Sequence, residues 1–128
     1  MTPAEHAQLL LDKAGEDIHV LAALRDDAAA SDAIWGFHAQ QAVEKLLKSL
    51  LIRLEIRFPF THRLLELADL LPPHQQTLLT NYESLLDLTP FAVEYRYSAL
   101  ALNPGEPPLD RNSLLTLIIQ FKKECSLP

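Results

Sequence analysis

A long run of helical periodicity between Ser31 and Ile56 sets the fold of this chain. Apolar residues recur three or four positions apart, and its leucines would line one side of a helix: Leu46, Leu47, Leu50, Leu51 and Leu54. Ser31 or Asp32 is a favourable N-cap, and Phe58-Pro59 stops the helix. The run therefore predicts one helix of roughly 37 Å at the usual rise per residue.

The rest of the chain has the same helical character, because alanine and leucine dominate and only 3 glycines occur. Proline, serine, threonine and aspartate at favourable positions predict further helices over residues 3–25, 62–71, 74–88 and 111–124, with Thr61 and Asp110 as two of the N-caps. Thr89-Pro90 should kink or break the path. We expect an all-α, up-and-down antiparallel bundle of four long helices plus one short helix, as a single domain over residues 1–128.

Cysteine content and hydropathy indicate the compartment. Cys125 has no partner for a disulfide, and no CxxC or Cys/His cluster predicts a zinc site. The acidic N-terminal segment lacks the basic and apolar regions of an export signal, and no apolar run reaches the roughly 18 residues that span a bilayer. We expect a soluble cytoplasmic protein without membrane contact, metal or cofactor.

Charge is unevenly distributed along the chain. The net charge of −6 argues against strong nonspecific nucleic-acid binding, which requires clustered cations. Residues 38–63 nevertheless carry five cations against two acids: Lys45, Lys48, Arg53, Arg57 and Arg63. These side chains would attract an anionic ligand to the second helix and the turn after it, although each of them could instead belong to an ordinary solvated face.

A polar ladder crosses the second helix. Phe37, Gln41, Glu44 and Lys48 follow one another at helical spacing on one side. Glu44 and Lys48 also form a favourable i, i+4 pair, worth about 0.2–0.5 kcal/mol without any ligand. An amide among leucines needs partners if it is buried, and we expect Gln41 to find them in the segment that contains Tyr95 and Arg96.

His62 completes the expected site. His62 follows a predicted N-cap, where the free backbone amides of the helix and the imidazole could together hold an anion. Alternatively, the His62 ring packs against the second helix and forms a hydrogen bond with a backbone carbonyl. The sequence therefore predicts a polar cluster that binds a nucleotide or another anion. Its members are Gln41, Glu44, Lys45, Lys48, His62 and Arg96. The alternative is that the cluster only fixes helix register.

The remaining aromatic and histidine residues indicate no further site. Trp35 and Phe37 are expected in the core or in a dimer contact, because no alternation of basic and aromatic residues accompanies them. The other histidines lack the i, i+4 spacing of a metal site and are expected to be surface or core residues: His6, His19, His38 and His74.

Three segments together resemble the HEPN family (higher eukaryotes and prokaryotes nucleotide-binding domain). They are FHAQQAVEKLLKSLL at residues 37–51, THRLLELADLL at 61–71 and EYRY at 94–97. The resemblance implies a helical bundle that is commonly dimeric and is often encoded beside a minimal nucleotidyltransferase, as in toxin–antitoxin pairs. The apolar band of the last helix, wider than one core face requires, independently favours a homodimer.

The ribonuclease motif of this family is incomplete. Active members carry an arginine followed four to six residues later by a histidine, but none follows Arg96, and Thr116 stands where the histidine after Arg111 would be. Threonine does not titrate near neutral pH and cannot act as the general acid or base. We therefore predict a noncatalytic module that binds a nucleotide or partner. The alternatives are a metal-independent ribonuclease toxin with a degenerate site and a purely structural dimeric scaffold.

Overall fold

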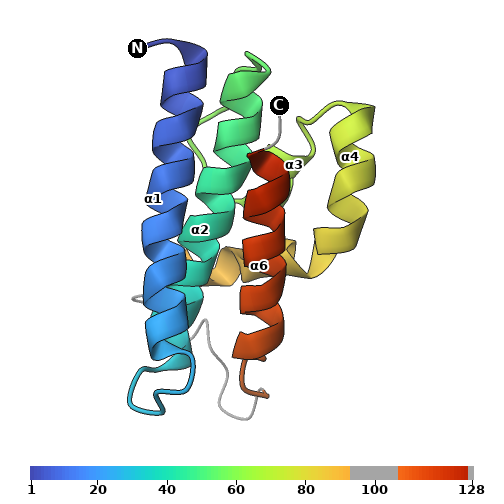
Figure 1. Cartoon of the computed structure of the whole chain (residues 1–128). Helices are drawn as coiled ribbons and strands as arrows, with labels where there is room; N and C mark the ends of the chain where they lie inside the picture. The colour runs from blue at the N-terminus through green and yellow to red at the C-terminus, as the bar shows by residue number, and fades with distance from the viewer. Residues whose placement is uncertain (93–106, 127–128) are drawn as a thin grey trace.

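The computed structural model describes residues 1–92 and 107–126 of the chain. Within these ranges it contains helices α1 (Pro3–Leu24), α2 (Asp32–Arg53), α3 (Leu64–Ala68), α4 (Pro73–Leu79) and α6 (Arg111–Cys125), with the 3₁₀ segment η1 (Thr80–Phe91) between α4 and α6. No strand occurs among these residues. The predicted all-α bundle is confirmed, and Figure 1 shows α1, α2 and α6 side by side with α4 set to one side.

Local capping explains where the long helices begin. The Thr2 hydroxyl accepts a hydrogen bond from the Glu5 amide, and the Ser31 hydroxyl does the same for Ile34. Helix α2 is shorter than predicted, ending at Arg53 rather than Ile56. The reason is that Glu55 adopts a left-handed conformation with φ of 57°, which ends the helix.

The core lies where α2 meets its neighbours. Trp35 has no exposed surface, and its indole N–H donates to the Leu21 carbonyl of α1 at 3.1 Å. Gly36 lets η1 approach α2, since a Cβ there would collide with the Phe91 ring. Trp35 is therefore a core residue that joins α1 to α2.

The third helix differs from its prediction. It covers Leu64–Ala68 instead of residues 62–71, and Thr61 is not its N-cap. The Thr61 hydroxyl instead donates to Glu66 and accepts from the Arg63 amide. Residues 61–63 are held against α2, as described below, and cannot wind into the first helical turn.

The fourth helix is not continuous. Helix α4 ends at Leu79, and the chain continues as η1 with Tyr82 outside helical geometry, at φ of −127°. This departure turns the buried Tyr82 ring onto Phe121 of α6, with centroids 5.0 Å apart. The break therefore precedes Thr89-Pro90, which lies inside η1.

Some sequence predictions fall partly or wholly outside this description. Segment 94–97 and most of the loop at 103–108 lie outside the described residues. None of the described helices has both the length and the apolar character needed to cross a membrane. The cytoplasmic location and the single-domain boundary stay predictions.

Candidate functional site

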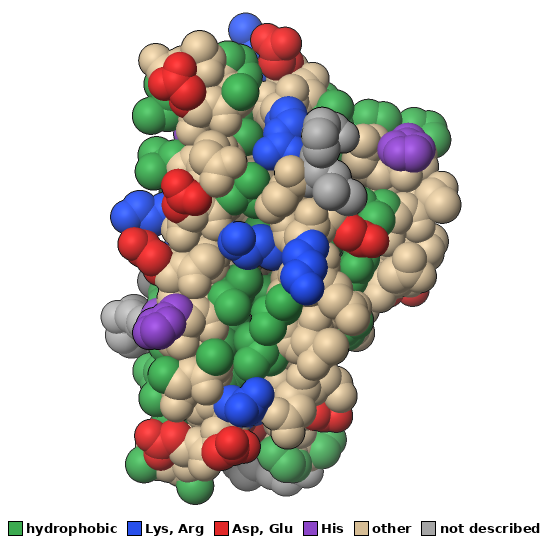
Figure 2. Space-filling view, in the orientation of Figure 1, with side chains coloured by type: hydrophobic (Ala, Val, Ile, Leu, Met, Phe, Trp, Pro, Cys, Tyr) green, Lys and Arg blue, Asp and Glu red, His purple; other side chains and the backbone are tan. Residues whose placement is uncertain are grey.

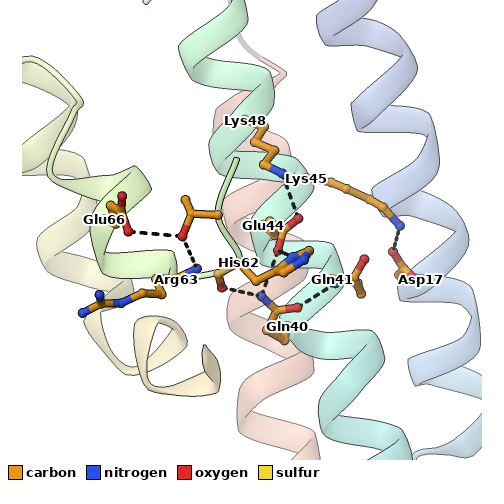
Figure 3. Close-up of polar contacts among 10 residues, drawn as sticks. Asp17, Gln40, Gln41, Glu44, Lys45, Lys48, His62, Arg63 and Glu66 are labelled. Carbon is orange, nitrogen blue, oxygen red and sulfur yellow. Dashed lines mark hydrogen bonds and ion pairs between the residues drawn. The ribbon is translucent and has the colours of Figure 1, made fainter. Parts of the chain in front are cut away.

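A buried pair of polar residues marks the face of α2 that turns away from α6. Gln40 has no exposed surface and Glu44 is 5% exposed, although leucine and valine surround them on the same helix. Buried amides and carboxylates need hydrogen-bond partners. Figure 3 shows that these partners come from α2 itself and from the loop that precedes α3.

Glu44 is the centre of this network. Its Oε1 accepts from Gln40 Nε2 at 3.1 Å and lies 2.9 Å from His62 Nδ1, while Oε2 accepts from Lys48 Nζ at 3.0 Å. Burial raises the pKa of this carboxyl, but the hydrogen bonds from Gln40, His62 and Lys48 and the Lys48 charge outweigh burial, so the pKa is lowered overall. Glu44 is thus a carboxylate that holds one lysine and one imidazole.

Gln40 attaches the loop to α2. Its Nε2 also donates to the His62 carbonyl at 2.9 Å, and its Oε1 accepts from Gln41 Nε2 at 2.8 Å. The prediction placed Gln41 in this central role, whereas Gln41 is half-buried and reaches the cluster only through Gln40. Gln40 could have been identified from the sequence, because it precedes Glu44 by four residues and therefore lies on the same face of the helix, among apolar residues.

Two phenylalanine rings extend the cluster toward solvent. Lys48 Nζ lies 5.8 Å from the centroid of Phe58 and 6.0 Å from that of Phe60, within the range of cation–π attraction. The Phe60 ring also stands edge-on to His62, with centroids 5.5 Å apart. Phe60 is 92% exposed, whereas the side chains of Lys48 and His62 are 16% and 23% exposed. The ring is therefore the most accessible of the three groups.

A second carboxylate cluster joins α2 to α1. Asp17, 8% exposed, accepts from Lys45 Nζ at 2.6 Å and lies 3.1 Å from His38 Nδ1. Like Glu44, it holds one lysine and one imidazole. Lys45 therefore turns toward α1 and away from the Glu44 cluster (Figure 3).

The predicted site residues are only partly brought together. Four of them share one network once Gln40 is included: Gln41, Glu44, Lys48 and His62. Lys45 belongs to the Asp17 cluster, and Arg96, like Tyr95, lies outside the described residues. The described part of the network thus comes from α2 and from the loop that precedes α3.

The chemistry of the cluster is that of ion pairing and hydrogen bonding. Within residues 1–92 and 107–126, no group of three or more histidine, cysteine or carboxylate side chains could hold a metal ion. An ammonium and an imidazole beside an exposed ring suit a planar anionic ligand. Glu44 limits the positive charge, because it already neutralises the Lys48 ammonium.

Comparison with known proteins gives the family. A family model described as HEPN domain matches residues 7–119, which is most of the chain. The chain belongs to the HEPN family. No curated protein and no solved structure shows a significant match to this HEPN chain. The resemblance inferred from the sequence motifs is therefore confirmed, and the matched range includes both carboxylate clusters.

The arginine that echoes the family's ribonuclease motif has other contacts in this HEPN domain. Arg111 donates to Asp32 from Nε at 3.2 Å and from Nη2 at 3.0 Å. Its two terminal nitrogens also donate to three carbonyls of the turn between α1 and α2: Leu24, Asp27 and Ala30. The guanidinium therefore joins the start of α6 to that turn.

Proposed function

We propose that this HEPN domain is a noncatalytic binding module that takes a nucleotide, or the corresponding group of a partner protein, on the α2 face. From the predicted site we keep Gln41, Glu44, Lys48, His62 and Arg96, and we add Gln40 and Phe60. Lys45 is left out, because it binds Asp17 of α1. The observation that carries the proposal is Phe60, a ring almost wholly exposed beside Lys48 and His62. The Phe60 ring has no role in the bundle core, and beside Lys48 and His62 it offers a face on which a nucleobase can stack.

The ring and the cations have complementary uses. A nucleobase stacks on an aromatic face without requiring a particular sequence, and a phosphate pairs with an ammonium or a protonated imidazole. Glu44 and Gln40 hold Lys48 and His62 in place before the ligand arrives, which reduces the entropy lost on binding. Arg57 and Arg63 are also exposed on the loop that carries Phe60, and both add positive charge to that loop.

The partner follows from the family. Small HEPN proteins are often encoded beside a minimal nucleotidyltransferase, in toxin–antitoxin systems or related assemblies, and we propose such an enzyme as the partner of this chain. A nucleotidyltransferase gene adjacent to the gene for this protein would support the pairing. RNA cleavage that is abolished by Arg96→Ala would instead support the ribonuclease alternative.

Phe60→Ala provides the direct test of ligand binding. Titration calorimetry with ATP, GTP and a short RNA should give heat above dilution for at least one of them with the wild-type chain. Loss of one stacking contact costs about 1–3 kcal/mol, so Phe60→Ala should raise Kd by roughly 5- to 150-fold. Because the side chain is exposed, the thermal midpoint should not change.

Leu65→Ala is the matched control, since Leu65 is also exposed, at 57%, but lies on α3 away from Lys48. It should leave Kd unchanged. If none of the three ligands produces heat, or if both substitutions weaken binding equally, the α2 face is not the site. The chain would then be better described as a scaffold.

A further inference from the structure

One part of the molecule is acidic and carries no lysine or arginine of its own. Residues 64–92 form α3, α4 and η1, and they contain four carboxylates but neither lysine nor arginine. The carboxylates are Glu66, Asp69, Glu83 and Asp87. In Figure 2 the lysine and arginine side chains of the described residues lie over α1, α2 and α6, and none lies over α4 at the right. A partner that docks on this part meets charge of one sign.

A groove of about 530 Å³ lies between α3, the end of α4 and η1. Three of the four carboxylates line it: Asp69, Glu83 and Asp87. Its apolar lining consists of Leu65, Ala68, Leu79 and Leu86. Among the described residues that line the groove there is no lysine, arginine or histidine. The groove therefore combines apolar surface with negative charge that its own walls do not neutralise.

The three carboxylates of the groove are exposed and unpaired. Within residues 1–92 and 107–126, none of them takes part in a salt bridge or in a hydrogen bond through its side chain. Glu44 and Asp17, by contrast, each hold a lysine. A single metal ion does not explain the three acids, because no such group in the described part of the chain could hold one. The charges are thus spread along the groove and suit a ligand that carries several cations.

The 3₁₀ geometry of η1 sets the spacing of these charges. Side chains three residues apart eclipse one another in a 3₁₀ helix, so Thr80, Glu83 and Leu86 follow one another along one edge of the groove. Asp87 comes four residues after Glu83, which is roughly 8 Å at the 3₁₀ rise per residue. Lysines one turn apart on an α-helix are separated by roughly 6 Å along its axis. Their flexible stems can therefore reach both carboxylates at once.

The apolar part of the groove is preformed. Leu65 is 57% exposed, whereas Ala68 and Leu79 are buried beneath it. The Gln76 amide donates to the carbonyls of Ala68 and Leu71 at 2.6 and 3.0 Å, and so ties α4 to the end of α3. An apolar side chain that enters the groove thus finds walls already in place, which reduces the entropy lost on docking.

We propose that this groove docks a basic amphipathic helix of a partner protein. An apolar side chain of that helix packs on Leu65 and Leu86, as in other complexes that lay a helix in a groove. Lysines or arginines on the flanking turns pair with Asp69, Glu83 and Asp87, and this complementary charge selects a basic segment over an acidic one. A nucleotide or another anion is repelled here, so the groove and the α2 face take ligands of opposite charge.

This docking surface is independent of the proposed nucleotide site. None of the residues that line the groove belongs to the Glu44 network. A variant that lacks the carboxylates of the groove should therefore bind nucleotide with the same Kd as the wild-type chain, and Phe60→Ala should bind the basic helix normally. Failure of one proposal is thus distinguishable from failure of the other.

Neutral substitutions in the groove test the proposal with a synthetic probe. The probe is a labelled helical peptide with leucines along one face and lysines on both flanks, and fluorescence anisotropy with the full chain should show saturable binding at micromolar concentrations. Asp69→Asn/Glu83→Gln/Asp87→Asn should raise Kd at least about tenfold, because the paired charges are lost. Leu65→Ser, which removes the apolar contact without changing charge, should also weaken binding. Added salt should weaken wild-type binding, because exposed charges are screened.

Asp12→Asn/Glu16→Gln/Asp26→Asn is the matched control, because it removes the same charge from exposed acids outside the groove. It should leave Kd unchanged. A scrambled peptide of the same composition, without an apolar face, should bind the wild-type chain far more weakly than the probe.

Four results would each overturn the proposal. The first is no binding of the probe, and the second is equal weakening by the two triple substitutions. The third is equal affinity for the scrambled peptide or for spermine, which would make the groove a site for any polycation. The fourth is a self-associating wild type whose mass falls to that of one chain with the groove substitutions, which would assign the groove to a second copy.

Discussion

At the scale of single residues, Glu44 shows how one buried carboxylate serves both stability and function. It is ionised because Lys48, His62 and Gln40 surround it with donors, and removing any donor would leave the charge poorly compensated. The same contacts fix the directions of the Lys48 and His62 side chains. Asp17 does the same for Lys45 and His38 on the neighbouring side of α2.

Glu44→Gln should reveal this contribution as a function of pH. It keeps the shape but removes the charge, and hydrogen bonds to charged groups are worth about 1.5–3 kcal/mol, so we expect the free energy of unfolding at neutral pH to fall by about 1–3 kcal/mol. The native pKa of Glu44 lies below its ordinary value of 4.5. The stabilisation is therefore complete above that value and is lost as the pH falls through the native pKa.

Urea titrations of both proteins between pH 7 and pH 3 measure the effect. The difference between the two stabilities should shrink as the pH falls below 4.5, because the carboxyl of the unfolded wild-type chain then takes up a proton more readily than the native one. Glu16→Gln, at an exposed carboxylate of α1, is the control and should change stability little at any pH. A gap that stays constant down to the lowest pH would contradict the assignment.

At the scale of elements, the ends of the helices depend on contacts from distant parts of the chain. Helix α3 begins late because the His62 carbonyl accepts from Gln40. Helix α4 gives way to η1 where the Tyr82 ring packs on Phe121. In this position, burial and a hydrogen bond from the tyrosine hydroxyl to Glu124 raise the pKa of Tyr82 to about 12. The turn between α1 and α2 is held from outside by Arg111.

Arg111→Ala should destabilise that junction. The guanidinium is 15% exposed, and its loss would leave Asp32 and three carbonyls without their donor, at an expected cost of about 2–4 kcal/mol. Arg111→Lys should recover only part of the loss, because an ammonium does not reproduce the planar fork. Urea denaturation gives the size of the effect, and amide hydrogen exchange should show faster opening near Asp27 and Ala30.

Arg25→Ala is the control for this experiment. Arg25 is the C-cap residue of α1 at the same turn, and it forms an exposed ion pair with Asp26 at 3.7 Å. We expect a change within about 0.5 kcal/mol. Equal destabilisation by the two alanine substitutions would show that the turn tolerates neither loss, and that Arg111 has no special part in holding it.

At the scale of the whole molecule, the bundle has a core that runs from α1 through α2 to α6. Leu11, Leu47 and Phe121 belong to one buried cluster, and Cys125 closes it at the end of α6. The thiol has no exposed surface, and burial raises its pKa far above the ordinary range. Both features make Cys125 unreactive while α6 is docked.

Thiol labelling should therefore report the unfolding of the whole bundle. In native buffer, Cys125 should react with a disulfide reagent far more slowly than an exposed cysteine, and its labelling rate should rise with urea in parallel with the loss of helical circular dichroism. The denatured chain at the same pH is the control for intrinsic reactivity. Rapid labelling under native conditions would mean that α6 detaches without unfolding of the remainder.

The sequence by itself determined the long helices and the family, because helical periodicity and capping depend on residues within about four positions of one another. The long α2, its Ser31 cap, the Asp110 cap of α6 and the Glu44–Lys48 pair follow from such local rules. The tertiary structure decided which partner each long polar side chain meets.

Lys45 and Lys48 are three residues apart on one helix, yet Lys45 binds a carboxylate of α1 and Lys48 binds a carboxylate of α2 itself. Gln40 has its central position only because the loop after α2 folds back and presents the His62 carbonyl. These contacts depend on how the helices are rotated and packed against one another, and that packing sums interactions from residues far apart in the sequence.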